Sequence, residues 1–399
     1  MENKRNKKIL IVMPKFPYPA KGACEQDRFE GIRILKNLGY DLSIISKIHP
    51  KQMETVKKVS DELGIKITPV LYKNNRSIKR IFNPLFWDGA AYEYRDKDIV
   101  DAFNNQLNKF CPGIIWFEYS NLWPLYKYAR KKKIPIITRS HNFEATHFLE
   151  EEGWRGLNLL RFISKFLGEI IVSKKSDMLF AITPKEAESY KKIGARKVLI
   201  LPLRSLGKYL DDSHTFRDND TINIFFMGST YNVVHNRKAL EFIIKEIAPA
   251  IEKQMPGKFV FHITGAKMPD DMLRFFGDRI IYHGYVDNMD EFVKNMDIAL
   301  VPSLFGAGMQ QKIFEPLCRG IPTITSKRGL ANYPFENEKH LLLAENLKEY
   351  IKTVIRMRDI DLRRNLSKNS IELCCELFSK EKIKSIISKG INEINLTNE

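Results

Sequence analysis

Short, nearly continuous apolar runs recur along the chain, separated by longer segments with apolar residues at helical spacing. The runs predict strands near residues 9–13, 40–46, 112–117, 134–138, 177–183 and 198–202, and again near 222–227, 259–265, 280–287, 297–302 and 321–326. Apolar runs of this kind are typical of strands buried in a parallel sheet. Their alternation with helices predicts an α/β fold built on doubly wound parallel sheets.

The length of 399 residues suits two domains of nearly 200 residues each. A polar segment with four aspartates separates the two series of strands: Asp211, Asp212, Asp218 and Asp220. We therefore expect a first domain at residues 1–205, a linker at 206–221 and a second domain at 222–375. A basic helix is expected at residues 376–399.

The charge balance of the chain indicates which kinds of partner it binds. Lysine and arginine outnumber aspartate and glutamate by 65 to 48, a formal net charge of +17. This excess indicates nucleic acid, anionic lipid or phosphorylated substrates as partners. No nucleic-acid-binding motif is recognisable, so we expect no nucleic acid and favour diphosphates and an anionic membrane surface. A charge that merely keeps the protein soluble is the alternative.

The N-terminus mimics a signal peptide, because a basic segment at residues 4–8 precedes apolar residues 9–13. Pro14 and Lys15 end the apolar run too early for that reading. No apolar run approaches the roughly 18 residues of a membrane span. We expect a cytoplasmic protein, with peripheral contact at the inner face of the cell membrane.

Two segments combine aromatic or aliphatic residues with cations. In residues 77–95, Lys79, Arg80 and Arg95 are interleaved with aromatic residues, a composition that fits interfacial binding as well as a helix packed on the core. Residues 154–171 have an apolar face at helical spacing, with Arg155 and Arg161 on it or beside it. We expect this second face to pack on the core.

The strand–helix–strand unit at residues 297–329 carries the clearest candidate chemistry. A loop with Gly306 and Gly308 leads into a helix that should begin near Lys312 and stop at Gly320, with Pro316 in its first turn. A glycine loop before a helix N-terminus attracts phosphate groups. Lys312 suits a diphosphate, and Glu315 can accept hydrogen bonds from ribose hydroxyls. A solvated lysine and a glutamate that favours the helix dipole explain the same spacing, which does not decide between the two.

The first half offers a histidine in a suitable place. His141 directly follows the strand predicted at 134–138, and ligands of open α/β sheets lie beyond the carboxyl ends of strands. A structural histidine is the alternative. Near the N-terminus, the first strand leads through a loop with Gly22 to a helix started by Arg28, without the Gly-x-Gly-x-x-Gly of dinucleotide-binding enzymes. Gly22 also fits an ordinary turn.

The second half carries a pattern that resembles the donor-site signature of GT-B glycosyltransferases of family 4, group 1 type. The pattern is Gly306-x-Gly308-x-x-x-Lys312-x-x-Glu315-x-x-x-x-Gly320-x-Pro322. In that family a glutamate at the position of Glu315 holds the ribose of a nucleotide sugar. The family's first glutamate is replaced here by Ala307, as in a branch with a Gly-x-Gly loop and a lysine. The resemblance implies two Rossmann-like domains facing across a cleft and a C-terminal helix crossing back to the first domain.

The resemblance also implies roles for single residues. His141 would lie near the transferred sugar and act with Lys312 and Glu315 in catalysis, while Gly22 and Arg28 would face the acceptor. The donor would contact the remaining family positions: Gly228, Ser229, Tyr285, Val286, Gly306, Ala307, Gly308 and Met309. Tyr285 and Val286 would pack on the nucleobase, although either also fits the core.

The implied activity is transfer of a hexose-type sugar, with retention, from a nucleotide-diphosphate sugar to a glycan, lipid-linked or protein acceptor. Envelope or surface polysaccharide synthesis is the expected setting. No cofactor and no metal are expected, because nothing resembles the Asp-x-Asp metal site of the other large transferase fold. Two rival functions stay open: a catalytically inactive nucleotide-sugar-binding protein, which Ala307 favours, and a GT-B nucleotide-sugar epimerase.

Overall fold

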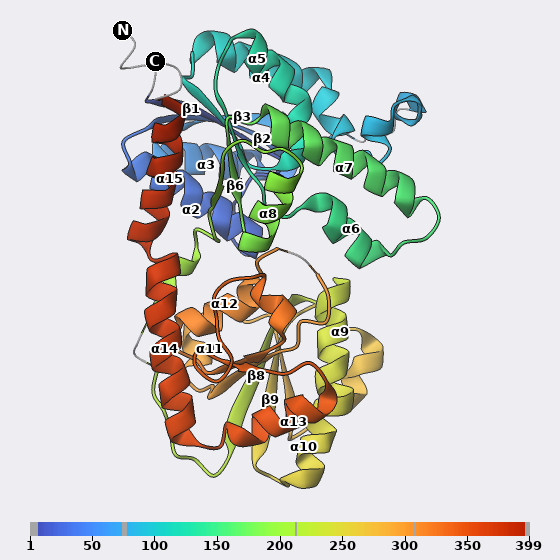
Figure 1. Ribbon diagram of the computed structural model, residues 1–399, viewed down its shortest axis with the longest axis vertical. Helices are drawn as coiled ribbons and strands as arrows, with labels where there is room; N and C mark the ends of the chain where they lie inside the picture. The colour runs from blue at the N-terminus through green and yellow to red at the C-terminus, as the bar shows by residue number, and fades with distance from the viewer. Residues whose placement is uncertain (1–6, 74–77, 212–213, 307, 396–399) are drawn as a thin grey trace. The chain divides into compact units, whose positions relative to one another are not determined.

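The chain divides into two compact units, each built on its own parallel sheet (Figure 1). The computed structural model describes residues 7–73, 78–211, 214–306 and 308–395. Unit 1 comprises Met1–Ser205 and Glu381–Glu399, and unit 2 comprises Leu206–Lys380. The α/β class and the two doubly wound sheets expected from the strand pattern are confirmed.

Unit 1 contains a seven-stranded parallel sheet in the order β3-β2-β1-β4-β5-β6-β7. Its strands are β1 (Lys8–Met13), β2 (Asp41–Ile48), β3 (Lys66–Leu71), β4 (Ile114–Phe117), β5 (Ile136–Arg139), β6 (Met178–Ala181) and β7 (Val198–Ile200). Its helices are α2 (Ala23–Asn37), α3 (Met53–Leu63), α4 (Lys97–Lys109), α5 (Tyr126–Lys131), α6 (Glu144–Glu152), α7 (Asn158–Lys175), α8 (Pro184–Lys192) and α15 (Lys380–Asn395). The order reverses beside β1, so the carboxyl ends of β1 and β4 form the switch point where ligands bind in such sheets.

The C-terminal helix α15 belongs to unit 1 through a regular apolar stripe. Ile383, Ile387, Ile391 and Ile394 are buried in the same core cluster as residues of β1 and α2. Their spacing of three and four residues puts them on one helix face, which covers the sheet. α15, drawn in red, lies along this sheet in Figure 1.

Unit 2 contains a six-stranded parallel sheet in the order β10-β9-β8-β11-β12-β13. Its strands are β8 (Ile222–Thr230), β9 (Phe259–Ala266), β10 (Ile280–Gly284), β11 (Ile298–Val301), β12 (Thr323–Thr325) and β13 (Leu342–Leu343). Its helices are α9 (Val234–Phe242), α10 (Ala248–Gln254), α11 (Met289–Val293), α12 (Gln311–Cys318), α13 (Leu347–Arg356) and α14 (Ile360–Phe378). The segment expected to be a linker opens this unit, and Tyr209 within it is buried.

The sequence patterns did not predict two strands, β3 and β13, because both lie at the edge of a sheet. β3 contains Pro69, whose ring removes a hydrogen-bond donor and is tolerated at a sheet edge. β13 has only two residues. Neither therefore shows the continuous apolar run that marks the inner strands.

Two local expectations are wrong, and a third holds only in part. Pro316 lies in the interior of α12, five residues after its first residue, and not in the first turn. Arg28 does not start its helix, because α2 begins at Ala23. The apolar face of α7 packs on the core through Phe162 and Phe166, whereas Leu159, Leu160 and Ile163 are exposed.

The basic and aromatic segment forms three short 3-10 turns, η2 (Ile78–Phe82), η3 (Pro84–Phe86) and η4 (Tyr92–Arg95). Phe86 and Tyr94 are buried, whereas Phe82 is 84% exposed. The Arg95 guanidinium stacks over the Phe86 ring at 5.0 Å. The described part of the segment is thus packed at one end and open at the other; Ser77 and the Lys79 side chain lie outside the description. Among the described residues, no helix is both long and apolar enough to cross a bilayer.

Candidate functional site

In unit 2, the loop between β11 and α12 has the backbone that its glycines predict. Gly306 and Gly308 adopt φ values of +102° and +75°, in the left-handed region that favours glycine. The Arg328 guanidinium donates to the Gly306 carbonyl oxygen over 3.0 Å. A Cβ added at Gly306 would lie 3.9 Å from the His235 ring, so the loop runs beside the start of α9. The starts of α9 and α12 therefore converge on this loop.

Lys312 is a buried cation at this convergence. Its side chain is 8% exposed, and its Nζ donates to Asn236 Oδ1 over 2.8 Å and lies 5.4 Å from the centre of the Phe226 ring. Within the described residues, no carboxylate forms an ion pair with it. Burial lowers the pKa of the Lys312 ammonium to about 7. The site holds a positive charge that the protein itself leaves without a counter-ion.

Asn236 fixes this lysine and is a residue that the sequence analysis missed. Its Nδ2 donates to the Thr230 carbonyl oxygen over 3.0 Å and to Ser229 Oγ over 3.3 Å, which ties α9 to the end of β8. A Cβ at Gly228 would lie 2.6 Å from the Tyr231 ring, so only glycine fits there. The expected donor positions Gly228 and Ser229 thus belong to the same cluster as Lys312.

Glu315 lies one turn further along α12 and is also buried. Gln311 Nε2 donates to its Oε2 over 2.7 Å, and Arg319 Nε and NH2 donate to its Oε1 over 3.1 and 2.9 Å. Lys312 and Glu315 therefore have different partners, although three residues separate them. The two hydrogen bonds from Arg319 hold the carboxylate in one orientation.

The remaining expected donor positions are spread around the same sheet edge. Met309 is buried in the loop before α12. Tyr285 and Val286 follow β10, and the Tyr285 ring is largely exposed. Ala307 lies outside the described residues.

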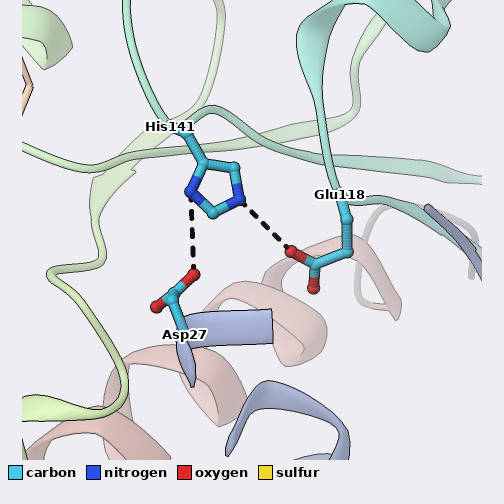
Figure 2. Close-up of side chains that lie close together, drawn as sticks. All are labelled: Asp27, Glu118 and His141. Carbon is cyan, nitrogen blue, oxygen red and sulfur yellow. Dashed lines mark ion pairs between the residues drawn. The ribbon is translucent and has the colours of Figure 1, made fainter. Parts of the chain in front are cut away.

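In unit 1, His141 lies between two carboxylates at the carboxyl end of the sheet. Figure 2 shows its ring between Asp27, from α2, and Glu118, which directly follows β4. Its Nδ1 is 3.8 Å from Asp27 Oδ2, and its Nε2 is 3.7 Å from Glu118 Oε2. These distances are too long for hydrogen bonds, and neither ring nitrogen has a hydrogen-bond partner among the described residues. The neighbouring residues fix the position of the ring, but those described form no hydrogen bonds with its two nitrogens.

Arg204 ties the two carboxylates together. Its guanidinium donates to both oxygens of Asp27, from Nε over 3.2 Å and from NH2 over 2.7 Å. It also donates to both oxygens of Glu118, over 2.8 Å each. A Cβ on Gly31 would overlap this guanidinium, so the glycine of α2 leaves the space that Arg204 occupies.

The charges of this cluster balance within unit 1. Burial alone would raise the pKa of Asp27 and of Glu118, but Arg204 together with the other neighbouring groups holds both pKa values below their usual range. Arg139 adds a second cation, 3.7 Å from Asp27. Burial lowers the pKa of His141 to about 4, against the opposing effect of Glu118. The imidazole is therefore neutral near pH 7, with one nitrogen as donor and one as acceptor.

The three groups Asp27, Glu118 and His141 also have the chemistry of metal ligands, and their ligand atoms lie within 4.8 Å of one another. However, Arg204 already occupies both oxygens of each carboxylate. A divalent cation would have to displace this guanidinium and lie close to Arg139. The donor set therefore fits an arginine-bridged cluster and not a metal centre.

The acceptor-side residues of the sequence analysis lie on α2 beside this cluster. Gly22 is the N-cap of α2, and a Cβ there would lie 2.5 Å from a carboxylate oxygen of Glu25. Arg28 is buried, and its Nε has no hydrogen-bond partner among the described residues. Arg28 Nε is thus one of several buried donors of unit 1 that have no hydrogen-bond partner among the described residues.

The sequence analysis missed Asp27, Glu118 and Arg204. Glu118 had a usable signal, because it directly follows a predicted strand just as His141 does. Asp27 is an ordinary helical position, and Arg204 follows the last strand of unit 1 within a segment that has no motif. Neither shows any feature in the sequence that sets it apart.

Comparison with known proteins bears on the fold and on the sequence of unit 2. Residues 221–359 match the family model described as "Glycosyl transferases group 1". No curated protein matches the chain.

Several solved structures share the fold over nearly the whole chain. A sucrose-phosphate synthase from Thermosynechococcus elongatus is 15% identical, with a TM-score of 0.71 over 98% of this chain and 100% of that one. Anabaena HepE in complex with UDP-glucose is 12% identical, with a TM-score of 0.64 over 98% and 100%. A variant of S. aureus TarM in complex with fondaparinux, α-GlcNAc-glycerol and UDP is 12% identical, with a TM-score of 0.69 over 97% and 99%. The chain thus has the two-domain GT-B fold, and residues 221–359 of its second half are similar to group 1 glycosyltransferases.

Proposed function

We propose that this protein is a glycosyltransferase that moves a sugar from a nucleotide-diphosphate sugar to a glycan, lipid-linked or protein acceptor. The observation that carries the proposal is Lys312, a buried ammonium beside a glycine loop and the starts of two helices. Unpaired backbone N–H groups and a cation favour a bound diphosphate. The same groups stabilise the charge that grows on the diphosphate as the glycosidic bond breaks.

Glu315 is proposed to hold the ribose of the donor. Gln311 and Arg319 donate three hydrogen bonds to its carboxylate, which still has acceptor capacity because such a group offers about four lone-pair sites. Tyr285 and Val286 are proposed to pack on the base. Two similar structures hold UDP or UDP-glucose, which makes UDP-sugars the first donors to test.

His141 is proposed to contact the transferred sugar. Its neutral ring offers one donor and one acceptor, and both nitrogens lack hydrogen-bond partners among the described residues. Sugar hydroxyls supply both kinds of partner. Gly22 and Arg28 are proposed to face the acceptor.

We propose retention of configuration and no requirement for a divalent metal. In this mechanism the acceptor attacks from the face that the diphosphate leaves, and the departing diphosphate takes the acceptor proton. Lys312 and the backbone of the glycine loop would supply the electrostatic support that a metal supplies in other transferases. The expected setting is synthesis of an envelope or surface glycan.

The test is a panel of nucleotide sugars, each incubated with and without candidate acceptors. A ligand that binds only the folded protein raises its melting temperature, so thermal shift selects the donor first. We then expect nucleotide release that depends on an acceptor, with a glycosylated product. Donor binding without any nucleotide release would support the inactive binder instead, and a changed sugar without acceptor product would support the epimerase.

A further inference from the structure

The helix α7 exposes apolar side chains on the face opposite to the one that packs on the core. Its inward side contains the buried Ser164, Gly168, Glu169, Val172 and Ser173, and the partly buried Phe162 and Phe166 pack against the core cluster. Its outward face carries Leu159, Leu160 and Ile163 in the first two turns. An amphipathic helix on a soluble domain normally turns its apolar stripe to the core and its polar residues outward. The exposed apolar group therefore indicates that the outward face contacts something apolar.

Two inward polar side chains, Glu169 and Ser164, have hydrogen-bond partners that fix the orientation of α7. Glu169 accepts from the Tyr190 hydroxyl over 2.8 Å and from the Glu144 backbone N–H over 2.9 Å. Ser164 donates to Asp88 Oδ1 over 3.2 Å. Turning the apolar face inward would leave these groups without partners.

More exposed apolar side chains continue this face at the start of the helix. Trp154 and Leu157, in the loop before α7, are 72% and 75% exposed. The turn η3, which follows the exposed Phe82, packs against α7. We call the set Phe82, Trp154, Leu157, Leu159, Leu160 and Ile163 the apolar edge of unit 1. An apolar cluster of this extent on a protein surface indicates a protein or membrane contact.

Cations gather at the other end of the same helix. A hollow of about 750 Å³ is lined almost entirely by basic side chains: Lys127, Arg130, Lys131, Lys174, Lys175, Arg196 and Lys197. The acidic side chain in its lining is Asp177, which is engaged by Arg130 over 3.0 Å. Helix C-termini attract cations, but the partial charge of a helix end is only about half a unit. The hollow therefore carries a large excess of positive charge.

We propose that α7 and the apolar edge dock unit 1 on an anionic bilayer, with α7 lying along the surface. The apolar edge would enter the boundary between headgroups and acyl chains, and the basic hollow would attract anionic headgroups. The charge favours this occupant over a second copy of the chain, because two copies carrying +17 each repel one another. Glu150 and Glu152 lie close to Trp154, so the electrostatic attraction comes from the C-terminal end of α7. This inference rests on the proposed function, since a lipid-linked acceptor would lie at that surface.

The test uses sedimentation of the full chain with vesicles of phosphatidylglycerol and phosphatidylcholine, against vesicles of phosphatidylcholine alone. We expect binding to the anionic vesicles that weakens as salt rises. Leu160→Glu with Ile163→Glu should reduce the partition coefficient at least tenfold, because two apolar side chains no longer enter the bilayer. Lys174→Glu with Lys175→Glu should reduce it by at least about fivefold per position.

A matched control is Met53→Glu in α3 of the same unit, since Met53 and Leu159 are 44% and 47% exposed. This change should leave vesicle binding as in the wild type. Quenching of tryptophan fluorescence by brominated lipid gives a second measurement, and Trp154→Phe should remove most of it. Equal loss in Met53→Glu, or no quenching of Trp154, would overturn the proposal.

Two further outcomes separate this proposal from its alternatives. If light scattering shows a dimer that Leu160→Glu with Ile163→Glu dissociates, the apolar edge is a protein interface and the membrane proposal is wrong. If vesicles do not bind but nucleotide release with a water-soluble acceptor persists, docking fails while the transferase function stands. The surface variants should keep wild-type turnover with such an acceptor.

Discussion

The two units treat buried charge in opposite ways. In unit 1, Arg204 and Arg139 balance Asp27 and Glu118, and His141 between them is neutral. In unit 2, Lys312 is buried with an amide oxygen as its hydrogen-bond partner and no ion-paired carboxylate among the described residues. The charges of the first arrangement balance within the protein and hold a ring in place. The second leaves a cation without a counter-ion, as the proposed diphosphate site requires.

The sharpest way to break this comparison is to remove each buried cation and measure stability. Arg204→Met should destabilise the protein by roughly 3–5 kcal/mol, because two carboxylates would be left buried without a partner. Lys312→Met should cost no stability, since it removes a buried charge that has no counter-ion. All four tryptophans belong to unit 1, so their fluorescence in urea follows that unit, and circular dichroism follows both. Equal losses in the two variants would contradict the contrast between the units.

Catalysis should depend on Lys312 more than donor binding does. Lys312→Ala is expected to reduce turnover by roughly 10²–10³-fold, as when one donor to a developing negative charge is removed. Donor affinity should fall less, because the charge on the diphosphate grows as the bond breaks. Lys238→Ala is the matched control, since Lys238 is exposed and paired with Glu241 over 2.8 Å. A similar loss of turnover in the control would leave Lys312 without a special role.

A substitution of Glu315 tests whether this buried carboxylate of unit 2 also binds the donor. Glu315→Gln should weaken nucleotide-sugar binding by roughly 1–3 kcal/mol, the cost of losing hydrogen bonds to a charged acceptor. Isothermal calorimetry measures the affinity, and circular dichroism checks that α12 is intact. Unchanged donor affinity in a folded variant would exclude the ribose role.

The pH dependence of donor binding gives a direct readout of the unpaired lysine. Burial lowers the pKa of Lys312 to about 7 in the free protein, and a bound diphosphate should raise it again. Affinity should therefore be constant below pH 7 and fall by up to tenfold per pH unit above it. Calorimetry in buffers with different ionisation enthalpies should show proton uptake at pH 8. Lys312→Arg should remove both effects, because an arginine stays charged; a slope that persists in this variant would assign the proton elsewhere.

The smallest expected effect is that of a chelator, which should leave turnover unchanged. Arg204 fills the cluster that most resembles a metal site, and in the proposed mechanism Lys312 supplies the charge that a metal supplies in other transferases. Activity is measured with and without chelator and after adding magnesium or manganese. Activity that disappears with the chelator and returns with metal would refute the proposed mechanism.

The apolar edge and the segment at residues 77–95 show how far composition can mislead. The composition of the basic and aromatic segment suggested interfacial binding at a membrane, yet Phe86 and Tyr94 are buried and Arg95 stacks on Phe86. The helix expected to pack on the core does so through Phe162 and Phe166, but it also exposes Leu159, Leu160 and Ile163. A periodic pattern shows that a helix has an apolar face, but the direction of that face depends on which polar groups find partners inside.

The sequence by itself determined the strands and the backbone of the glycine loop. Inner strands can be predicted from the sequence because burial on both faces requires continuous apolar runs. The loop backbone can be predicted because Gly306 and Gly308 adopt the left-handed conformation that glycine allows. His141 was also located correctly at the end of a strand, because the chain geometry of a parallel sheet is regular.

Only the tertiary structure decided which charges meet. Arg204 lies 177 residues from Asp27 and 86 from Glu118, and Lys312 lies 76 residues from Asn236. Buried ionic groups find partners through the packing of whole elements, so no local pattern records the pairing. The same packing pairs the buried charges of unit 1 with one another and leaves Lys312 without a counter-ion among the described residues, as the proposed ligand site requires. The reason is that the free energy of a buried charge depends on its neighbours in space and not on those in sequence.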